Sequence, residues 1–161
     1  MTGRLIGIAR RNARRAPMET LAAGRISVET GLEGDARGPK YPARRITVLA
    51  REDWEAALGD LPADAADLPW TTRRANLLVE DVRLPRAKGG VLRIGPVVLE
   101  ITQETNPCAR MEEAFPGLLK ALHPEWRGGV CCAVREGGPI ALGDAVEVLV
   151  APEERTRVLP G

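Results

Sequence analysis

The residue with the clearest chemical potential is Cys108, which follows Pro107 and opens the predicted helical segment CARMEEA. A thiol at the start of a helix lies beside main-chain N–H groups without partners and at the positive end of the helix dipole. Both favour the thiolate, which is the form of cysteine that attacks sulfur or binds a soft metal. Position alone leaves a second interpretation open, a buried structural cysteine, which is common in protein cores.

Arginines concentrate immediately before two predicted strands, as the pairs Arg44–Arg45 and Arg73–Arg74. Guanidinium groups bind phosphate or carboxylate in a planar, two-point geometry that lysine does not reproduce. Hydroxyl and amide side chains flank the second pair: Thr71, Thr72 and Asn76. These groups could hold a phosphorylated or pterin-like ligand, or they could form a solvated rim. The excess of 20 Arg over 3 Lys fits anion binding, but a GC-rich genome would also explain it.

Scarce residue types exclude several classes of enzyme. The only histidine is His123 and the only serine is Ser27, which excludes two-histidine zinc motifs and disfavours a Ser-His-Asp hydrolase. None of the three lysines stands in a recognisable cofactor motif, so we do not expect pyridoxal phosphate. The adjacent Cys131 and Cys132 cannot bridge each other without severe strain. Three cysteines form no disulfide framework, so we expect a reducing, cytoplasmic location.

Charge and hydropathy disfavour two classes of partner. The net charge is +1, which gives no general electrostatic case for nucleic acid. The densest basic run, Arg10, Arg11, Arg14 and Arg15, has no interleaved aromatic residues and is expected to be a solvated loop. No stretch of 18 apolar residues occurs, so we expect no membrane span.

The element pattern predicts one domain over residues 1–150, followed by a flexible tail over 151–161. Short strands separated by Gly and Pro are predicted at 5–9, 26–30, 45–50, 75–79, 91–94, 97–102, 129–135 and 145–150. Helical segments are predicted at 51–58, 108–114 and 117–122, and a loop at 61–69. Cys131 and Cys132 alternate along a strand, so one is expected in the core and the other could be exposed. The fold class expected is mostly β with a few short helices (α+β), as a barrel or sandwich.

Seven stretches taken together resemble the MOSC family, named for the C-terminal domain of molybdenum cofactor sulfurase. They occur in the family's order and cover nearly the whole chain: GLEGDARG, RRITVLA, TTRRANLLVEDVRL, LRIGPVVLEIT, NPCARMEE, RGGVCCAVREGG and IALGDAVEV. The chain is similar to a small stand-alone bacterial member, and the resemblance implies a MOSC-type β-barrel.

The resemblance also implies roles for particular residues. Cys108 matches the family's essential cysteine, which carries persulfide sulfur or ligates molybdenum. Arg74 and Asn76 match a segment that holds the pterin and phosphate of the molybdenum cofactor, and Arg73, Thr72 and Arg127 lie in adjoining motifs. Three positions depart from common family residues, namely Met111 for a second Cys, Arg37 for His and Ala75 for Glu.

Three functions are consistent with this resemblance. The first is a sulfur carrier or molybdenum cofactor-binding protein, which would take sulfur from a cysteine desulfurase-like donor. The second is a molybdenum-dependent reductase of N-hydroxylated compounds, which would need an electron-donor protein. The third is a non-catalytic binding module, in which Cys108 would react no faster than an ordinary thiol.

Overall fold

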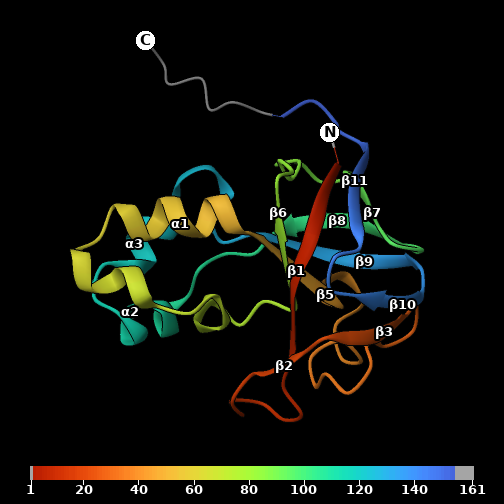
Figure 1. Cartoon of the computed structure of the whole chain (residues 1–161), viewed down its shortest axis with the longest axis horizontal. Coiled ribbons are helices and arrows are strands. Elements are labelled where there is room, and N and C mark those ends of the chain that lie inside the picture. The colour runs from red at the N-terminus through yellow and green to blue at the C-terminus, as the bar shows by residue number, and fades with distance from the viewer. Residues whose placement is uncertain (1, 155–161) are drawn as a thin grey trace.

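A computed structural model describes residues 2–154, and its main feature is a sheet that closes on itself (Figure 1). Within these residues, seven strands run in the order β11-β7-β8-β9-β5-β6-β1, and β1 also pairs with β11. The barrel strands are β1 (Thr2–Arg10), β5 (Ile46–Ala50), β6 (Leu77–Glu80), β7 (Val91–Ile94), β8 (Val97–Glu104), β9 (Val130–Glu136) and β11 (Ala145–Val150). The predicted mostly-β barrel with short helices is therefore confirmed.

The strand β5 shows how the sequence serves two hydrophobic layers at once. All five of its residues are buried, because the barrel interior lies on one side and the helices lie on the other. Ile46 and Val48 belong to the interior cluster, whereas Leu49 belongs to the cluster beneath the helices. Side chains alternate between the two faces of a strand, so a continuous apolar run is what a strand covered on both faces requires.

The helices lie together on one side of the barrel (Figure 1). Strands β5 and β6 are parallel, and a parallel pair needs a long crossover connection. That crossover contains α1 (Arg51–Gly59) and two 3-10 helices, η2 (Ala63–Asp67) and η3 (Trp70–Arg73). The connection from β8 to β9 contains α2 (Ala109–Ala114), α3 (Leu118–Leu122) and η4 (Pro124–Trp126). Both connections therefore bring their residues to the same side of the barrel.

A second, three-stranded sheet has the order β10-β3-β4. Its strands are β3 (Ala23–Ser27), β4 (Gly31–Leu32) and β10 (Gly138–Ala141), and β2 (Glu19–Leu21) extends the barrel sheet beside β1. The sequence pattern did not predict β2, β4 or β10, which are short and rich in small or polar residues. The predicted loop at 61–69 contains η2, and η1 (Pro42–Arg44) precedes β5.

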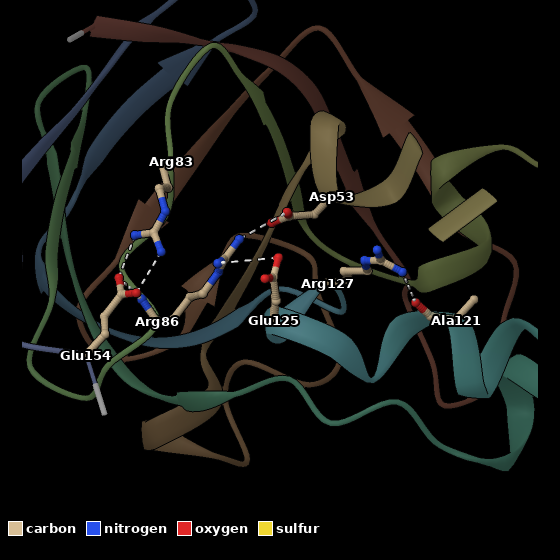
Figure 2. A network of polar contacts seen from close by, with 7 residues as sticks. All are labelled: Asp53, Arg83, Arg86, Ala121, Glu125, Arg127 and Glu154. Atoms are coloured by element: carbon tan, nitrogen blue, oxygen red, sulfur yellow. Dashed lines mark hydrogen bonds and ion pairs between the residues drawn. The ribbon is translucent and has the colours of Figure 1, made fainter. Parts of the chain in front are cut away.

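The chain beyond β11 is described as far as Glu154, and residues 151–154 form neither helix nor strand. Glu154 accepts two hydrogen bonds from the Arg83 guanidinium, at 2.6 and 2.7 Å (Figure 2). The part of the predicted tail at 155–161 lies outside the described residues. Among residues 2–154, no helix combines the length and the apolar character needed to cross a membrane.

Candidate functional site

Cys108 lies immediately before α2, where its extended backbone (φ −122°, ψ 176°) makes it the residue that caps the helix. The helix was predicted from residue 108 and begins one residue later, at Ala109. The Cys108 side chain is exposed to solvent. A reagent, a donor protein or a ligand can therefore reach this thiol.

Arg73, at the end of η3, is a buried cationic residue whose charge interacts with Cys108. Its side chain is only 6% exposed, and it donates hydrogen bonds to the main-chain oxygens of Gly128 (3.0 Å) and Thr105 (2.7 Å). Burial lowers the pKa of Arg73 to about 10, and the nearby thiols of Cys108 and Cys131 act in the opposite direction. The guanidinium thus remains charged at neutral pH, and it is held rigidly near the exposed thiol.

Arg74 follows in the left-handed conformation (φ 63°), which turns its side chain away from the direction taken by Arg73. Its Nη2 donates to the main-chain oxygen of Ala16 at 2.5 Å, while its buried Nε has no hydrogen-bond partner within the described chain. Burial lowers the pKa of Arg74, and the positive charges of Arg110 and Arg37 lower it further. Arg74 therefore belongs to a group of arginines that lie close enough to repel one another.

Asn76 is buried at the junction of three barrel strands. Its Oδ1 accepts hydrogen bonds from the Thr47 N–H (3.0 Å) and hydroxyl (3.3 Å), and its Nδ2 donates to the main-chain oxygen of Ala9 (3.2 Å). The amide is therefore occupied by β1 and β5. In this arrangement it positions the strand that follows Arg74.

The remaining predicted residues lie in different places. Thr72 is half-buried in η3, and its N–H donates to the oxygen of Pro69 at 3.0 Å. Arg127 faces the helices: its Nη1 donates to the Asp60 carboxylate (2.6 Å) and to the main-chain oxygen of Ala121 (3.0 Å), the contact drawn in Figure 2. The structure thus ties Arg73 to the segment that leads to Cys108, and it ties Arg127 to the helical side.

Cys131 and Cys132 are both buried, so the expectation that one of them could be exposed is wrong. Cys132 lies in the barrel interior. Cys131 points to the opposite face, where its Sγ lies 3.3 Å from the Thr105 hydroxyl. The Thr105 side chain lies beside Cys131 on this outer face and helps to cover it.

A hollow of about 320 Å³, here called the arginine hollow, lies among segments that are far apart in the sequence. One alanine, one tyrosine and seven cationic residues line it: Ala36, Tyr41, Arg11, Arg14, Arg15, Arg37, Lys40, Arg44 and Arg110. None of these lining residues is acidic. Arg110 lies in α2, two residues after Cys108, and Cys108 itself is not among the residues that line the hollow.

The arginine hollow corrects one prediction and extends another. In the basic run at 10–15, Arg14 and Arg15 lie in an exposed turn, as predicted, whereas Arg11 is buried; all three line the hollow. Arg44 also lines it, as expected of an arginine before a strand. Sequence reasoning missed Arg37 and Arg110. Their positions within two of the seven matching motifs were the available signal.

Main-chain contacts hold the walls of the hollow in place. Asp35 is buried, and its carboxylate accepts hydrogen bonds from the N–H groups of Arg11 (3.2 Å) and Gly38 (3.4 Å). The Ala36 N–H donates to the oxygen of Arg11 at 2.8 Å. At Gly38, a Cβ would lie 2.1 Å from the oxygen of Thr30, so only glycine fits there. The loop that carries Arg37 is therefore fixed before any ligand binds.

The electrostatics of the hollow are unfavourable in the absence of an anion. Burial lowers the pKa of Arg37, and the neighbouring charges of Arg11 and Arg44 lower it further, with Asp35 acting against them. Burial also lowers the pKa of Arg11, with a further contribution from Arg74. The Nε of Arg44 is buried without a hydrogen-bond partner within residues 2–154. Like charges and unpartnered donors of this kind cost stability, and a bound anion would offset that cost.

The comparisons with known proteins agree with this architecture. The family model for the MOSC domain matches residues 36–147. The crystal structure of the YuaD protein from Bacillus subtilis is similar, with a TM-score of 0.71 and 20% identity over 92% of this chain and 96% of that one. The crystal structure of YiiM from Escherichia coli has a TM-score of 0.70 and 16% identity, covering 95% of this chain and 73% of that one.

YiiM from Geobacillus stearothermophilus is also similar, with a TM-score of 0.66 and 15% identity over 92% of this chain and 75% of that one. At these identities the structural likeness shows the fold. No curated protein matches the sequence. The family model covers more than half of the chain and confirms the resemblance to this family. The chain belongs to the MOSC domain family.

Proposed function

We propose that this protein binds an anionic pterin cofactor of the molybdenum cofactor type in and beside the arginine hollow, and that Cys108 is its reacting thiol. One observation carries the proposal. An exposed cysteine opens the same short helix on which Arg110, two residues later, lines a hollow with seven cationic side chains. Attack on sulfur or coordination of a metal needs a reachable thiol, and a phosphate-bearing cofactor needs guanidinium donors.

The donor groups fit such a cofactor. The buried Nε atoms of Arg44 and Arg74 have no acceptor within the described chain, and a phosphate oxygen is an acceptor they could use. Arg37 and Arg110 would contribute further charge-assisted hydrogen bonds. When bound, the cofactor supplies a redox-active molybdenum centre that a cysteine thiolate can ligate. Cys108 is the exposed thiol in the described chain that could do this.

In the sulfur-carrier version of the proposal, the sulfur donor is the persulfide of a cysteine desulfurase-like protein. The Cys108 thiolate attacks the outer sulfur of that persulfide. A new S–S bond forms at Cys108 while the donor S–S bond breaks, and the donor leaves as a thiolate. The proton stays on the outer sulfur as that sulfur passes to Cys108. The outer sulfur has the same oxidation level before and after the transfer, so the step needs no external oxidant or reductant.

The other residues position these groups. Arg73 braces the segment that leads to Cys108 through its hydrogen bond to Thr105. Asn76 holds β6 against β1 and β5 and so fixes the start of the strand after Arg74. Thr72 lies in the 3-10 turn that carries Arg73. We assign Arg127 to the packing of the helices, because both of its contacts are made there.

Peptide mass spectrometry after incubation with a desulfurase and cysteine tests the role of Cys108. The peptide containing Cys108 should gain one sulfur, and the peptide containing the buried Cys131 and Cys132 is the control within the same sample. Protein purified from its own host is analysed in parallel for molybdenum and pterin, as wild type and as Cys108→Ser. Metal that is lost in the variant without any persulfide would assign the ligand version. Equal loading of wild type and variant by both measurements would remove Cys108 from the mechanism.

A further inference from the structure

We infer that the arginine hollow takes a ligand with a diphosphate and a flat aromatic group, of the nucleoside diphosphate class, in preference to a single phosphate. The inference rests on the proposed function, because it concerns the same anion site. It goes beyond that function in naming what part of a ligand the hollow selects. The ligand could be a free nucleotide or a nucleotide joined to the cofactor, since both present the same chemistry.

The first argument is the amount of positive charge. A phosphate monoester carries about −1.5 to −2 charges at neutral pH and has three terminal acceptor oxygens. The hollow has six arginines and one lysine along its walls and no acid among its lining residues. The Asp35 carboxylate, which acts on Arg11 and Arg37, is engaged by main-chain N–H groups. One phosphate therefore leaves most of the donors without an acceptor.

The second argument is the distribution of that charge. The cations come from the segment after β1, from the loop before η1, from η1 and from α2. They surround a volume of about 320 Å³, near the lower end of the range for small-molecule pockets. The chain as a whole has a net charge of only +1. Such a compact cationic hollow suits a short polyanion better than the extended backbone of a nucleic acid.

The third argument is Tyr41, the only tyrosine in the chain. It lines the hollow and is 51% exposed. The Arg44 guanidinium lies 5.8 Å from the centre of its ring, and the Arg44 N–H donates to the main-chain oxygen of Tyr41 at 2.9 Å. One 3-10 turn thus holds an aromatic ring and a phosphate-binding group together. An exposed aromatic ring beside arginines is a surface on which a base can stack.

Isothermal titration calorimetry on the full chain tests this inference with GDP, ADP, GMP, pyrophosphate, inorganic phosphate and a single-stranded oligonucleotide. We expect the nucleoside diphosphates to bind at least ten-fold more tightly than GMP or inorganic phosphate. Arg37→Gln should weaken GDP and pyrophosphate alike by about ten-fold or more. The matched control is Arg135→Gln, which removes an exposed arginine paired with Glu100 outside the hollow and should change neither affinity by more than two-fold.

Tyr41→Ala separates the aromatic group from the phosphates. The substitution should weaken the binding of GDP by several-fold and leave the affinity for pyrophosphate unchanged. Equal affinities for GDP and GMP would overturn the inference, and so would an equal loss for GDP and pyrophosphate in Tyr41→Ala. Tighter binding of a single-stranded oligonucleotide than of GDP would overturn it in favour of nucleic acid. None of these titrations depends on the chemistry of Cys108, so their failure is distinct from a failure of the persulfide test.

Discussion

Replacing Asn76 by alanine separates a structural role for its amide from a direct role in ligand binding. The substitution removes the acceptor for the Thr47 N–H (3.0 Å) and the donor to the oxygen of Ala9 (3.2 Å). A buried polar group left without its partner costs about 1–3 kcal/mol. Two such groups give roughly 2–6 kcal/mol, and we expect the lower half of that range, since larger effects of single substitutions are exceptional.

Urea unfolding followed by tryptophan fluorescence measures this loss. The control is Thr47→Val, which removes only the hydroxyl that bonds the Asn76 Oδ1 (3.3 Å) and main-chain N–H (3.0 Å). Because the two side chains share the hydrogen bond from the Thr47 hydroxyl to the Asn76 Oδ1, the double variant should be less destabilised than the sum of the single variants, by about 0.5–3 kcal/mol. An Asn76→Ala protein that unfolds within about 0.5 kcal/mol of wild type, yet no longer binds anions, would refute the structural assignment.

Two further predictions concern contacts outside the hollow. Hydrogen bonds from Arg83 lower the pKa of Glu154 to about 2, below the value of about 4.3 expected in the unfolded chain. The Arg83–Glu154 interaction therefore stabilises the fold fully above about pH 4.3, and this stabilisation is lost as the pH falls towards 2. The Tm difference between wild type and Glu154→Gln should vanish over that interval. A Tm difference that is independent of pH would contradict this. Arg127→Met should lower the free energy of unfolding by about 1–2 kcal/mol and change the anion affinity by less than two-fold. A ten-fold loss of anion affinity in calorimetry would instead assign Arg127 to the binding site.

The local residue pattern was sufficient to predict the barrel strands that carry long apolar runs. The strand at 46–50, the hairpin at 91–104 and the helix at 51–59 are set by nearby residues, and their predicted bounds were close to those observed. Strands β2, β4 and β10 are two to four residues long. Such strands exist because a partner lies beside them, and that information is absent from any short stretch of sequence.

The candidate site also combines features that the local sequence predicts with features that it does not. The position of Cys108 before a helix follows from Pro107 and the helical pattern after it. The arginine hollow does not, because Arg11, Arg37 and Arg110 meet only when the barrel is complete. The hydrogen bond from the Arg11 N–H to the buried Asp35 carboxylate likewise joins residues 24 positions apart. These are long-range properties that residue types and spacing do not encode individually.

The pairing of β1 with β11 joins Thr2–Arg4 to Ala145–Glu147, at the two ends of the described chain. During synthesis on the ribosome, β1 must therefore wait until Ala145–Glu147 has emerged before it finds this neighbour. Until then, one edge of β1 has no mate and can pair with other chains. The same adjacency makes the protein a natural subject for circular permutation: a short linker across this seam, with new ends opened in an exposed loop, would let the barrel close early.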